Sequence, residues 1–292
     1  MGGSTAVTNA FSVDVEDYFH VSAFASTIRP ENWERLESRV ERNTERVLAR
    51  LDEHGVKATF FVLGWIAQRH PALIQGIYRQ GHEVACHGFS HQLVYRQSQA
   101  TFREETLRAK GILEDIIQAP VLGYRAASYS ITARSIWALD VLAEAGFRYD
   151  SSIFPVRHDL YGMPNAPRLP YRMETPSGHT LVEFPLTTKR MLGAQLPVAG
   201  GGYFRLYPYR LTKWALRSIN RRESRPFIFY LHPWEVDPQQ PRIVGAPWRS
   251  RFRHYNNLDR CEARLVRLLG DFRFAPVREV LRNLGLWDAQ QV

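Results

Sequence analysis

Short runs of residues that favour strands alternate with amphipathic stretches along the first half of the chain. The runs are rich in Val, Phe and Tyr and predict strands, whereas apolar residues spaced three and four apart predict helices. The predicted strands cover residues 11–19, 57–63, 83–86, 121–124 and 147–149, and the predicted helices cover 40–54, 65–79, 99–118 and 133–145. Such alternation is typical of a parallel β/α architecture with right-handed crossovers.

The pattern lapses between residues 154 and 202, where prolines recur, and two short β signals at Thr180–Phe184 and around Phe204 predict a hairpin insertion. It then returns with a helix at 209–220, a strand at 226–231 and C-terminal helices at 258–269 and 277–284. No glycine-rich loop follows the first strand, which favours a barrel over an open nucleotide-binding sheet. The irregular stretch 21–37 is long enough to lie over an active site.

The chain has neither an internal repeat nor a low-complexity linker. We therefore expect residues 1–292 to form a single α/β domain, with residues 240–292 as a C-terminal extension packed on the barrel. Within the helix at 99–118, the spacing of Phe102, Leu107 and Leu113 predicts that all three face inward.

The composition, 45% hydrophobic and 23% charged, is that of an ordinary globular protein. The net charge of +9 raises the question of a polyanionic partner. Basic residues cluster locally only at 217–225 and 249–253, so we expect no specific nucleic-acid binding, whereas peripheral contact with an anionic membrane or glycan is compatible with this charge. Two distant cysteines, Cys86 and Cys261, form neither a disulfide framework nor a cysteine-rich metal site.

The sequence contains no apolar run of 18 residues and no charged-then-apolar segment at its start. These features predict a protein without a transmembrane segment, and a cytoplasmic location is the simplest expectation.

Ionisable residues lie at the carboxyl ends of five predicted strands, which meet at one mouth if the sheet is a barrel. They are Asp14, Glu16, Asp17, His87, His91, Arg125, Asp150 and His232. Three acids at one strand end repel each other, so a metal or basic side chains must share the space. Two imidazoles with one carboxylate would make an open site suited to Zn²⁺ or another divalent metal.

The motifs that carry these residues resemble those of the NodB-homology polysaccharide deacetylases, carbohydrate esterase family 4. They are SVDVED, HGFSH at 87–91, GYRAAS at 123–128, YDSS at 149–152 and LHPWE at 231–235. The stretches VDVEDYFHVSAF, GGGYFRL and YLHPWE look like the branch found in exopolysaccharide and exosortase-associated gene clusters.

This resemblance implies a distorted (β/α)7 barrel and metal-dependent removal of acetyl groups from an N-acetylhexosamine-containing poly- or oligosaccharide. Asp14 matches the general base, and His232 matches the general acid. His87 and His91 match the metal-binding imidazoles, and Arg125 matches the residue that positions the base.

Asp150 sits where a carboxylate could tether the acid histidine, although the match is looser. The implied metal is a divalent ion, Zn²⁺ first, with Co²⁺, Ni²⁺ or Mn²⁺ as alternatives.

The acid motif departs from the family's adjacent aspartates, which leaves the third metal ligand open between Glu16 and Asp17. Strand alternation puts Asp14 and Glu16 on the same side and favours Glu16. Gly88 replaces the usual Ser or Thr after the first histidine, and Ala127 stands where a Pro is typical.

Two further interpretations follow from the same residues. One is a cyclic-amide hydrolase of the allantoinase type, which shares the strand-end layout. The other is a glycan-binding barrel that has lost catalysis, which the altered acid motif, Gly88 and Ala127 motivate. The expected partner is an N-acetylated glycan substrate, and the oligomeric state is left open.

Overall fold

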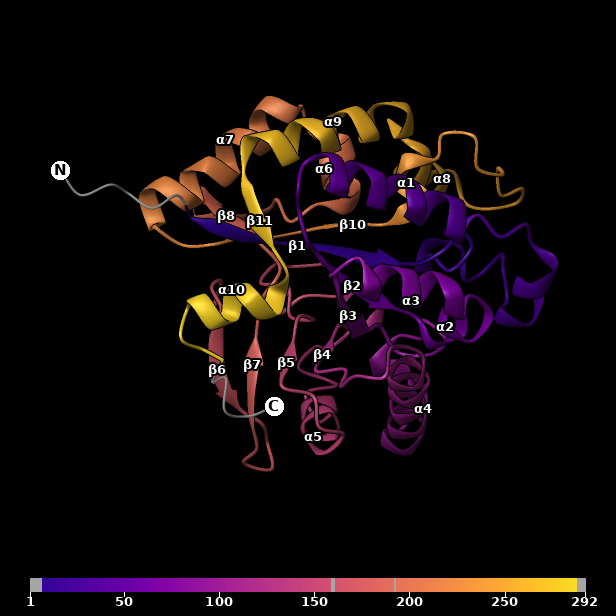
Figure 1. Cartoon of the computed structure of the whole chain (residues 1–292), viewed down its shortest axis with the longest axis horizontal. Helices are drawn as coiled ribbons and strands as arrows, with labels where there is room; N and C mark the ends of the chain where they lie inside the picture. The colour runs from indigo at the N-terminus through magenta and orange to yellow at the C-terminus, as the bar shows by residue number, and fades with distance from the viewer. Residues whose placement is uncertain (1–6, 159–160, 192, 288–292) are drawn as a thin grey trace.

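A computed structural model describes residues 7–158, 161–191 and 193–287. A parallel sheet lies at its centre, with helices around it (Figure 1). The parallel strands are β1 (Thr8–Val15), β2 (Thr59–Val62), β3 (Glu83–Cys86), β4 (Gly123–Tyr124), β5 (Tyr149–Asp150), β7 (Thr180–Glu183) and β10 (Ile228–Leu231). In space they follow the order β10, β1, β2, β3, β4, β5, β7. β1 therefore lies between β2, the next strand in the sequence, and β10, which is more than 200 residues away in the sequence.

Most helices form where the apolar spacing predicts them, with shorter bounds in places, but those at 201–206 and 248–255 are not predicted by it. They are α1 (Val40–Glu53), α2 (Gly64–Arg69), α3 (Pro71–Arg79), α4 (Gln99–Ile117), α5 (Ala138–Glu144), α6 (Gly201–Leu206), α7 (Tyr209–Ser218), α8 (Trp248–Tyr255), α9 (Leu258–Asp271) and α10 (Val277–Asn283). Pro71 opens α3, where its missing N–H costs no helical hydrogen bond, and so divides the helix predicted at 65–79. The inward orientation predicted for Leu107 is wrong, because 46% of this side chain is exposed.

An irregular segment closes the barrel between β7 and β10. The Thr187 hydroxyl donates to the carbonyl of Ile228 (2.6 Å) and accepts from its N–H (2.8 Å). Farther along, the N–H of Tyr230 donates to the carbonyl of Ala199 (2.7 Å). Side-chain and isolated backbone bonds thus replace a ladder, and the expected distorted barrel is confirmed.

The two β signals predicted to form one hairpin insertion belong to different elements. β7 pairs in parallel with β5 and is a barrel strand, while antiparallel β6 (Tyr171–Glu174) flanks it. Phe204 lies in α6, and a separate hairpin joins β8 (Thr188–Met191) to β9 (Ala194–Pro197). The β7 pairing joins distant segments, so local alternation alone could not distinguish a barrel strand from an insertion.

The last described strand pairs with the first. β11 (Arg273–Ala275) pairs in parallel with Thr8–Ala10 of β1, on the edge that β2 occupies farther along the strand. The N–H of Val277, at the start of α10, donates to the Thr59 hydroxyl (2.8 Å). No helix within the described residues is long and apolar enough to span a bilayer.

A substitution at Gly200, which precedes α6 and lies against Tyr230 of β10, tests how the barrel closes. Its φ is +129°, and a Cβ there would collide with the carbonyl oxygen of Tyr230. We expect Gly200→Ala to lower the free energy of unfolding by roughly 2–5 kcal/mol, from strain and overpacking. Gly111→Ala in α4 is the matched control, because a Cβ there meets nothing within 4 Å. That change should stabilise the protein by about 0.5–1 kcal/mol, and equal urea midpoints for the two variants would contradict this account.

Candidate metal centre and its neighbours

A carboxylate and two imidazoles meet where β1 and β3 end. Glu16 Oε1 lies 3.1 Å from His87 Nε2 and 3.0 Å from His91 Nε2, and all three side chains are buried. One possible ligand atom from each residue lies within 4.8 Å of the others. Two imidazoles and one carboxylate suit a divalent ion and leave a coordination position open.

Hydrogen bonding prepares His87 to bind a cation. Its Nδ1 lies 2.7 Å from the carbonyl oxygen of Arg125, which fixes the proton on Nδ1 and leaves the Nε2 lone pair facing Glu16. Nearby, Gly88 has φ +75°, a left-handed conformation that favours glycine over Ser or Thr. His91 Nε2 points at Glu16, as expected of an imidazole that shares a cation with this carboxylate, and its Nδ1 has no hydrogen-bond partner among the described residues.

Burial raises the pKa of Glu16, but the neighbouring imidazoles of His91, His232 and His87 hold it well below its usual range. Glu16 is therefore the ionised partner that a bound cation requires. The residues present fit a divalent metal ion by donor type, orientation and charge.

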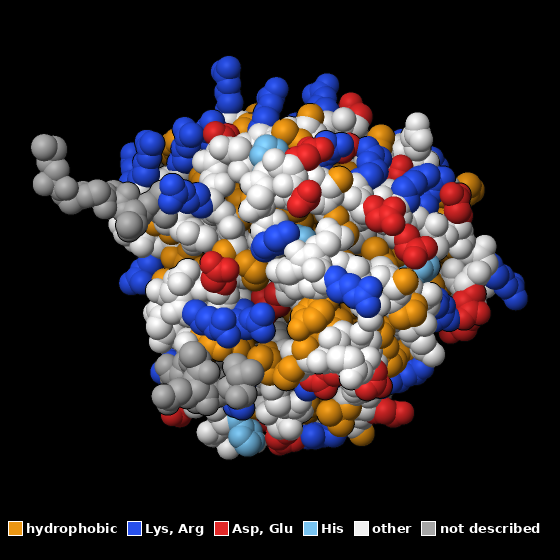
Figure 2. All heavy atoms as spheres, in the orientation of Figure 1, with side chains coloured by type: hydrophobic (Ala, Val, Ile, Leu, Met, Phe, Trp, Pro, Cys, Tyr) orange, Lys and Arg blue, Asp and Glu red, His pale blue; other side chains and the backbone are white. Residues whose placement is uncertain are grey.

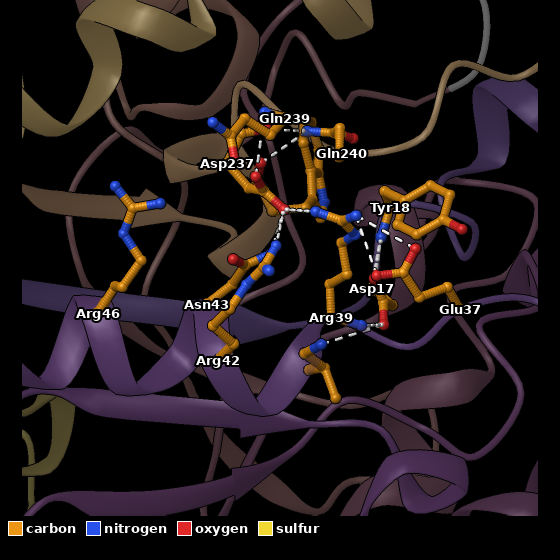
Figure 3. A network of polar contacts seen from close by, with 12 residues as sticks. Asp17, Tyr18, Glu37, Arg39, Arg42, Asn43, Arg46, Asp237, Gln239 and Gln240 are labelled. Carbon is orange, nitrogen blue, oxygen red and sulfur yellow. Dashed lines mark hydrogen bonds and ion pairs between the residues drawn. The ribbon is translucent and has the colours of Figure 1, made fainter.

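Asp17, the alternative third ligand, faces a different part of the structure (Figure 3). Its Oδ2 accepts hydrogen bonds from Ser38 Oγ (2.9 Å) and from the N–H groups of Arg39 (2.6 Å) and Val40 (3.1 Å). It thus caps the first turn of α1, whose free N–H groups favour a carboxylate. Glu16, not Asp17, lies with the imidazoles.

Arg125 holds the carboxylate of Asp14, which lies two residues before the candidate metal ligand Glu16. Its Nη1 donates to Asp14 Oδ1 (2.6 Å) and to Ser12 Oγ (2.8 Å), while Nη2 donates to Ser151 Oγ (3.0 Å). Arg125 and Asp14 are both almost fully buried, so each charge depends on the other. The Tyr129 hydroxyl also donates to Asp14, Oδ2, at 3.4 Å.

His232 faces the cluster from the end of β10. Its Nε2 lies 3.7 Å from Glu16 Oε1, and its Nδ1 lies 3.3 Å from Glu235 Oε2. Burial lowers the pKa of His232, but the carboxylates of Glu16, Glu235 and Asp14 outweigh it and raise the pKa to about 9. A protonated imidazole therefore stands at the mouth at neutral pH.

Glu235 is the carboxylate beside His232, in place of the expected Asp150. Its carboxylate accepts hydrogen bonds from the backbone N–H of His232 (3.1 Å) and from Arg205 Nε (2.8 Å). Burial raises its pKa, but Arg205 and His232 bring it down to about 2. The pattern His-Pro-Trp-Glu, a cap residue with an acid three positions later, is the sequence signal that could have revealed this role.

Asp150 instead lies with a second buried acid. It accepts a hydrogen bond from Ser152 Oγ (2.5 Å) and neighbours Glu183 across the β5–β7 pairing. Burial raises the pKa of both carboxyl groups, that of Asp150 to about 6. The two acids therefore favour a shared proton, and Asp150 has no described contact with His232.

A cavity of about 280 Å³ borders His91 on the side of the irregular stretch 19–33. Its apolar walls include Phe19, Val21, Ile28, Trp33 and Leu93. The stretch predicted to overlie the site thus lines a space beside the candidate metal centre.

Fold and site together define an α/β barrel with a buried two-histidine, one-carboxylate centre at the carboxyl ends of its strands. Residues 34–149 match the family model described as polysaccharide deacetylase, and residues 151–282 match a domain of unknown function, DUF3473. Residues 34–149 therefore match the polysaccharide deacetylases, the family that the sequence motifs resemble.

Two curated relatives match over short stretches. A chitooligosaccharide deacetylase of Bradyrhizobium is 35% identical over 100 residues, 34% of this chain and 43% of its own length. A peptidoglycan-N-acetylglucosamine deacetylase of Bacillus cereus is 33% identical over 70 residues, 24% of this chain and 26% of its own length. The matches therefore span less than half of either relative.

Solved structures match over nearly the whole chain and support the fold. A Mycobacterium smegmatis protein assigned to the polysaccharide deacetylases has a TM-score of 0.63 at 21% identity, covering 100% of this chain and 94% of its own. Puue allantoinase has a TM-score of 0.63 at 16% identity, covering 98% and 94%.

The contact between Glu235 and His232 can be tested by titration. We expect Glu235→Gln to lower the pKa of His232 by about one unit or more, because the imidazolium loses an adjacent negative charge. Histidine C–H signals in NMR spectra of the metal-free protein measure this. Glu262→Gln, which removes an outer partner of Arg46 and Arg50, is the control and should leave His232 unchanged. An unaltered pKa in Glu235→Gln would exclude the contact.

Proposed function

We propose that the protein is a metal-dependent N-deacetylase that removes acetyl groups from an N-acetylhexosamine-containing glycan. The observation that carries the proposal is that His232 faces Glu16 in the buried group Glu16, His87 and His91, while Arg125 holds Asp14 two residues before Glu16. The names of the curated relatives, which act on chitooligosaccharide and peptidoglycan N-acetylglucosamine, support the substrate class.

Glu16, His87 and His91 would hold the ion, and Zn²⁺ suits this donor set best. When bound, the ion would polarise the amide carbonyl and promote attack by water.

Asp14 would take a proton from the attacking water, and Arg125 keeps its carboxylate aimed at the site. His232 would donate the proton on Nε2 to the departing amine, while Glu235 faces Nδ1 and stabilises the imidazolium. Arg125 and Glu235 thus act as positioning residues in this proposal.

Biosynthesis of an exopolysaccharide is the cellular process that we propose for the deacetylation. It rests on the resemblance of stretches such as GGGYFRL to the branch found in exopolysaccharide gene clusters.

Acetate release tests the proposed chemistry. We expect the zinc-loaded protein to release acetate from N-acetylated chitooligosaccharides, and Asp14→Asn and His232→Ala each to lower kcat by at least about 10²-fold. Circular dichroism should show that both variants stay folded. Leu107→Ser, on the exposed face of α4, is the control and should retain full activity.

Other outcomes would point to the competing interpretations. Ring opening of allantoin without acetate release would favour a cyclic-amide hydrolase. Glycan binding without release, in a protein that holds no metal, would favour an inactive barrel.

Metal content tests the ligand assignment. We expect Glu16→Gln to lose stoichiometric zinc, because the carboxylate that lies with the two imidazoles is neutralised. Asp17→Asn should keep its zinc and instead lose about 1 kcal/mol of stability as the cap of α1 weakens. Elemental analysis and thermal unfolding measure the two effects, and loss of zinc in Asp17→Asn alone would reverse the assignment.

A further inference from the structure

The three most exposed large hydrophobic side chains among the described residues lie within nine positions of one another. They are Val244 (89% exposed), Trp248 (72%) and Phe252 (56%). Trp248 and Phe252 are four residues apart in α8, so they share one face of the helix. A monomeric protein rarely exposes such a group without a partner.

Positive charge surrounds this apolar group. Residues 238–258 include four arginines and no Asp or Glu. All four arginines, Arg242, Arg249, Arg251 and Arg253, are exposed. None of them forms an ion pair with any residue that the structure describes, whereas many arginines elsewhere do. The segment therefore offers an apolar ridge flanked by uncompensated cations.

The opposite face of α8 is anchored near the mouth of the barrel. The His254 ring stacks on Trp234 at 4.1 Å, and Trp234 stacks on His232 at 5.1 Å. His254 Nε2 also pairs with Gln240 Oε1 at 2.6 Å. The exposed ridge is thus held in fixed relation to the candidate catalytic histidine.

We propose that the segment from Arg242 to Arg253 docks on an anionic membrane surface. Val244, Trp248 and Phe252 enter the interface between headgroups and acyl chains, and the four arginines bind the anionic headgroups. Basic amphipathic helices with Trp and Phe on the apolar face bind membranes in this way. A soluble anionic glycan would match the arginines but would give Val244 and Phe252 no apolar environment, so the membrane fits the whole surface better.

This docking would hold the mouth of the barrel close to the lipid. Under the proposed deacetylase function, it favours glycans attached to a lipid as substrates. Since that consequence rests on the proposed function, docking is measured by vesicle binding in the absence of any glycan, so that either idea can fail alone.

A second basic surface provides the contrast. α7 and the turn after it carry Arg210, Arg221 and Arg222 around Trp214, which is 45% exposed, and line a cavity of about 520 Å³. Lys and Arg crowd the edge of the molecule over α7 and α9 (Figure 2). This surface could attract anions through its charge, so the test must separate it from α8.

The full chain is sedimented with vesicles of phosphatidylglycerol and phosphatidylcholine, and with phosphatidylcholine alone, at 0.1 M salt. We expect binding to the anionic vesicles, weak binding to the neutral ones, and release as salt is raised to 0.5 M. The double variant Trp248→Ser/Phe252→Ser should bind at least about tenfold more weakly, because the apolar contact is lost. Arg249→Gln/Arg253→Gln should weaken binding by about tenfold.

Two controls keep the result specific. Leu107→Ser removes an exposed apolar side chain of α4, and Arg210→Gln/Arg221→Gln removes charge from α7; both should bind like the unaltered protein. Thermal unfolding verifies that each variant is folded. Absence of binding to anionic vesicles, binding lost through the α7 change and not the α8 changes, or retention by a soluble anionic polysaccharide but not by vesicles would each overturn the proposal.

Discussion

The buried ion pair between Arg125 and Asp14 is the interaction on which the site depends. A guanidinium with no exposed surface must have its charge compensated and its donors satisfied, and Arg125 meets this demand through Ser12, Asp14 and Ser151. These partners come from β1 and from the residue after β5, while the carbonyl of Arg125 binds His87, the residue after β3. One side chain and its own peptide group thereby connect three strand ends. Removing one member would leave an unpaired buried charge, which costs about 3–5 kcal/mol.

Other buried carboxylates at the mouth of the barrel also depend on neighbouring groups that compensate their charge. Glu16 is surrounded by imidazoles, Glu235 lies between Arg205 and His232, and Asp17 is satisfied by N–H groups of α1. Asp150 and Glu183 neighbour each other, and burial raises the pKa of both carboxyl groups, as it also does for Asp17. Each acid therefore differs in charge and in role because its neighbours differ, although all lie near strand ends.

The sequence predicted most of the barrel because each early strand and helix has its own local pattern. It also placed Asp14, Glu16, His87, His91, Arg125 and His232 at one mouth, since parallel strands bring their carboxyl ends together. It could not identify β7 as a barrel strand, because β7 pairs with β5 only after a long connection that itself contains β6. The cap pattern His-Pro-Trp-Glu points to Glu235 as the neighbour of His232, but the contact of Glu235 with Arg205, a residue distant in sequence, has no local signal.

The pairing of β1 has a consequence for how the chain folds during synthesis. β1 is made before the other barrel strands, yet it pairs with β10 at Ile228–Leu231 and with β11 at Arg273–Ala275. Until β10 is made, this apolar strand keeps one edge unpaired, and such edges invite pairing with other chains. Contacts so distant in sequence also form slowly. The barrel can therefore be completed only after β10 and β11 have been made, and β1 is the segment that most needs protection by chaperones in the meantime.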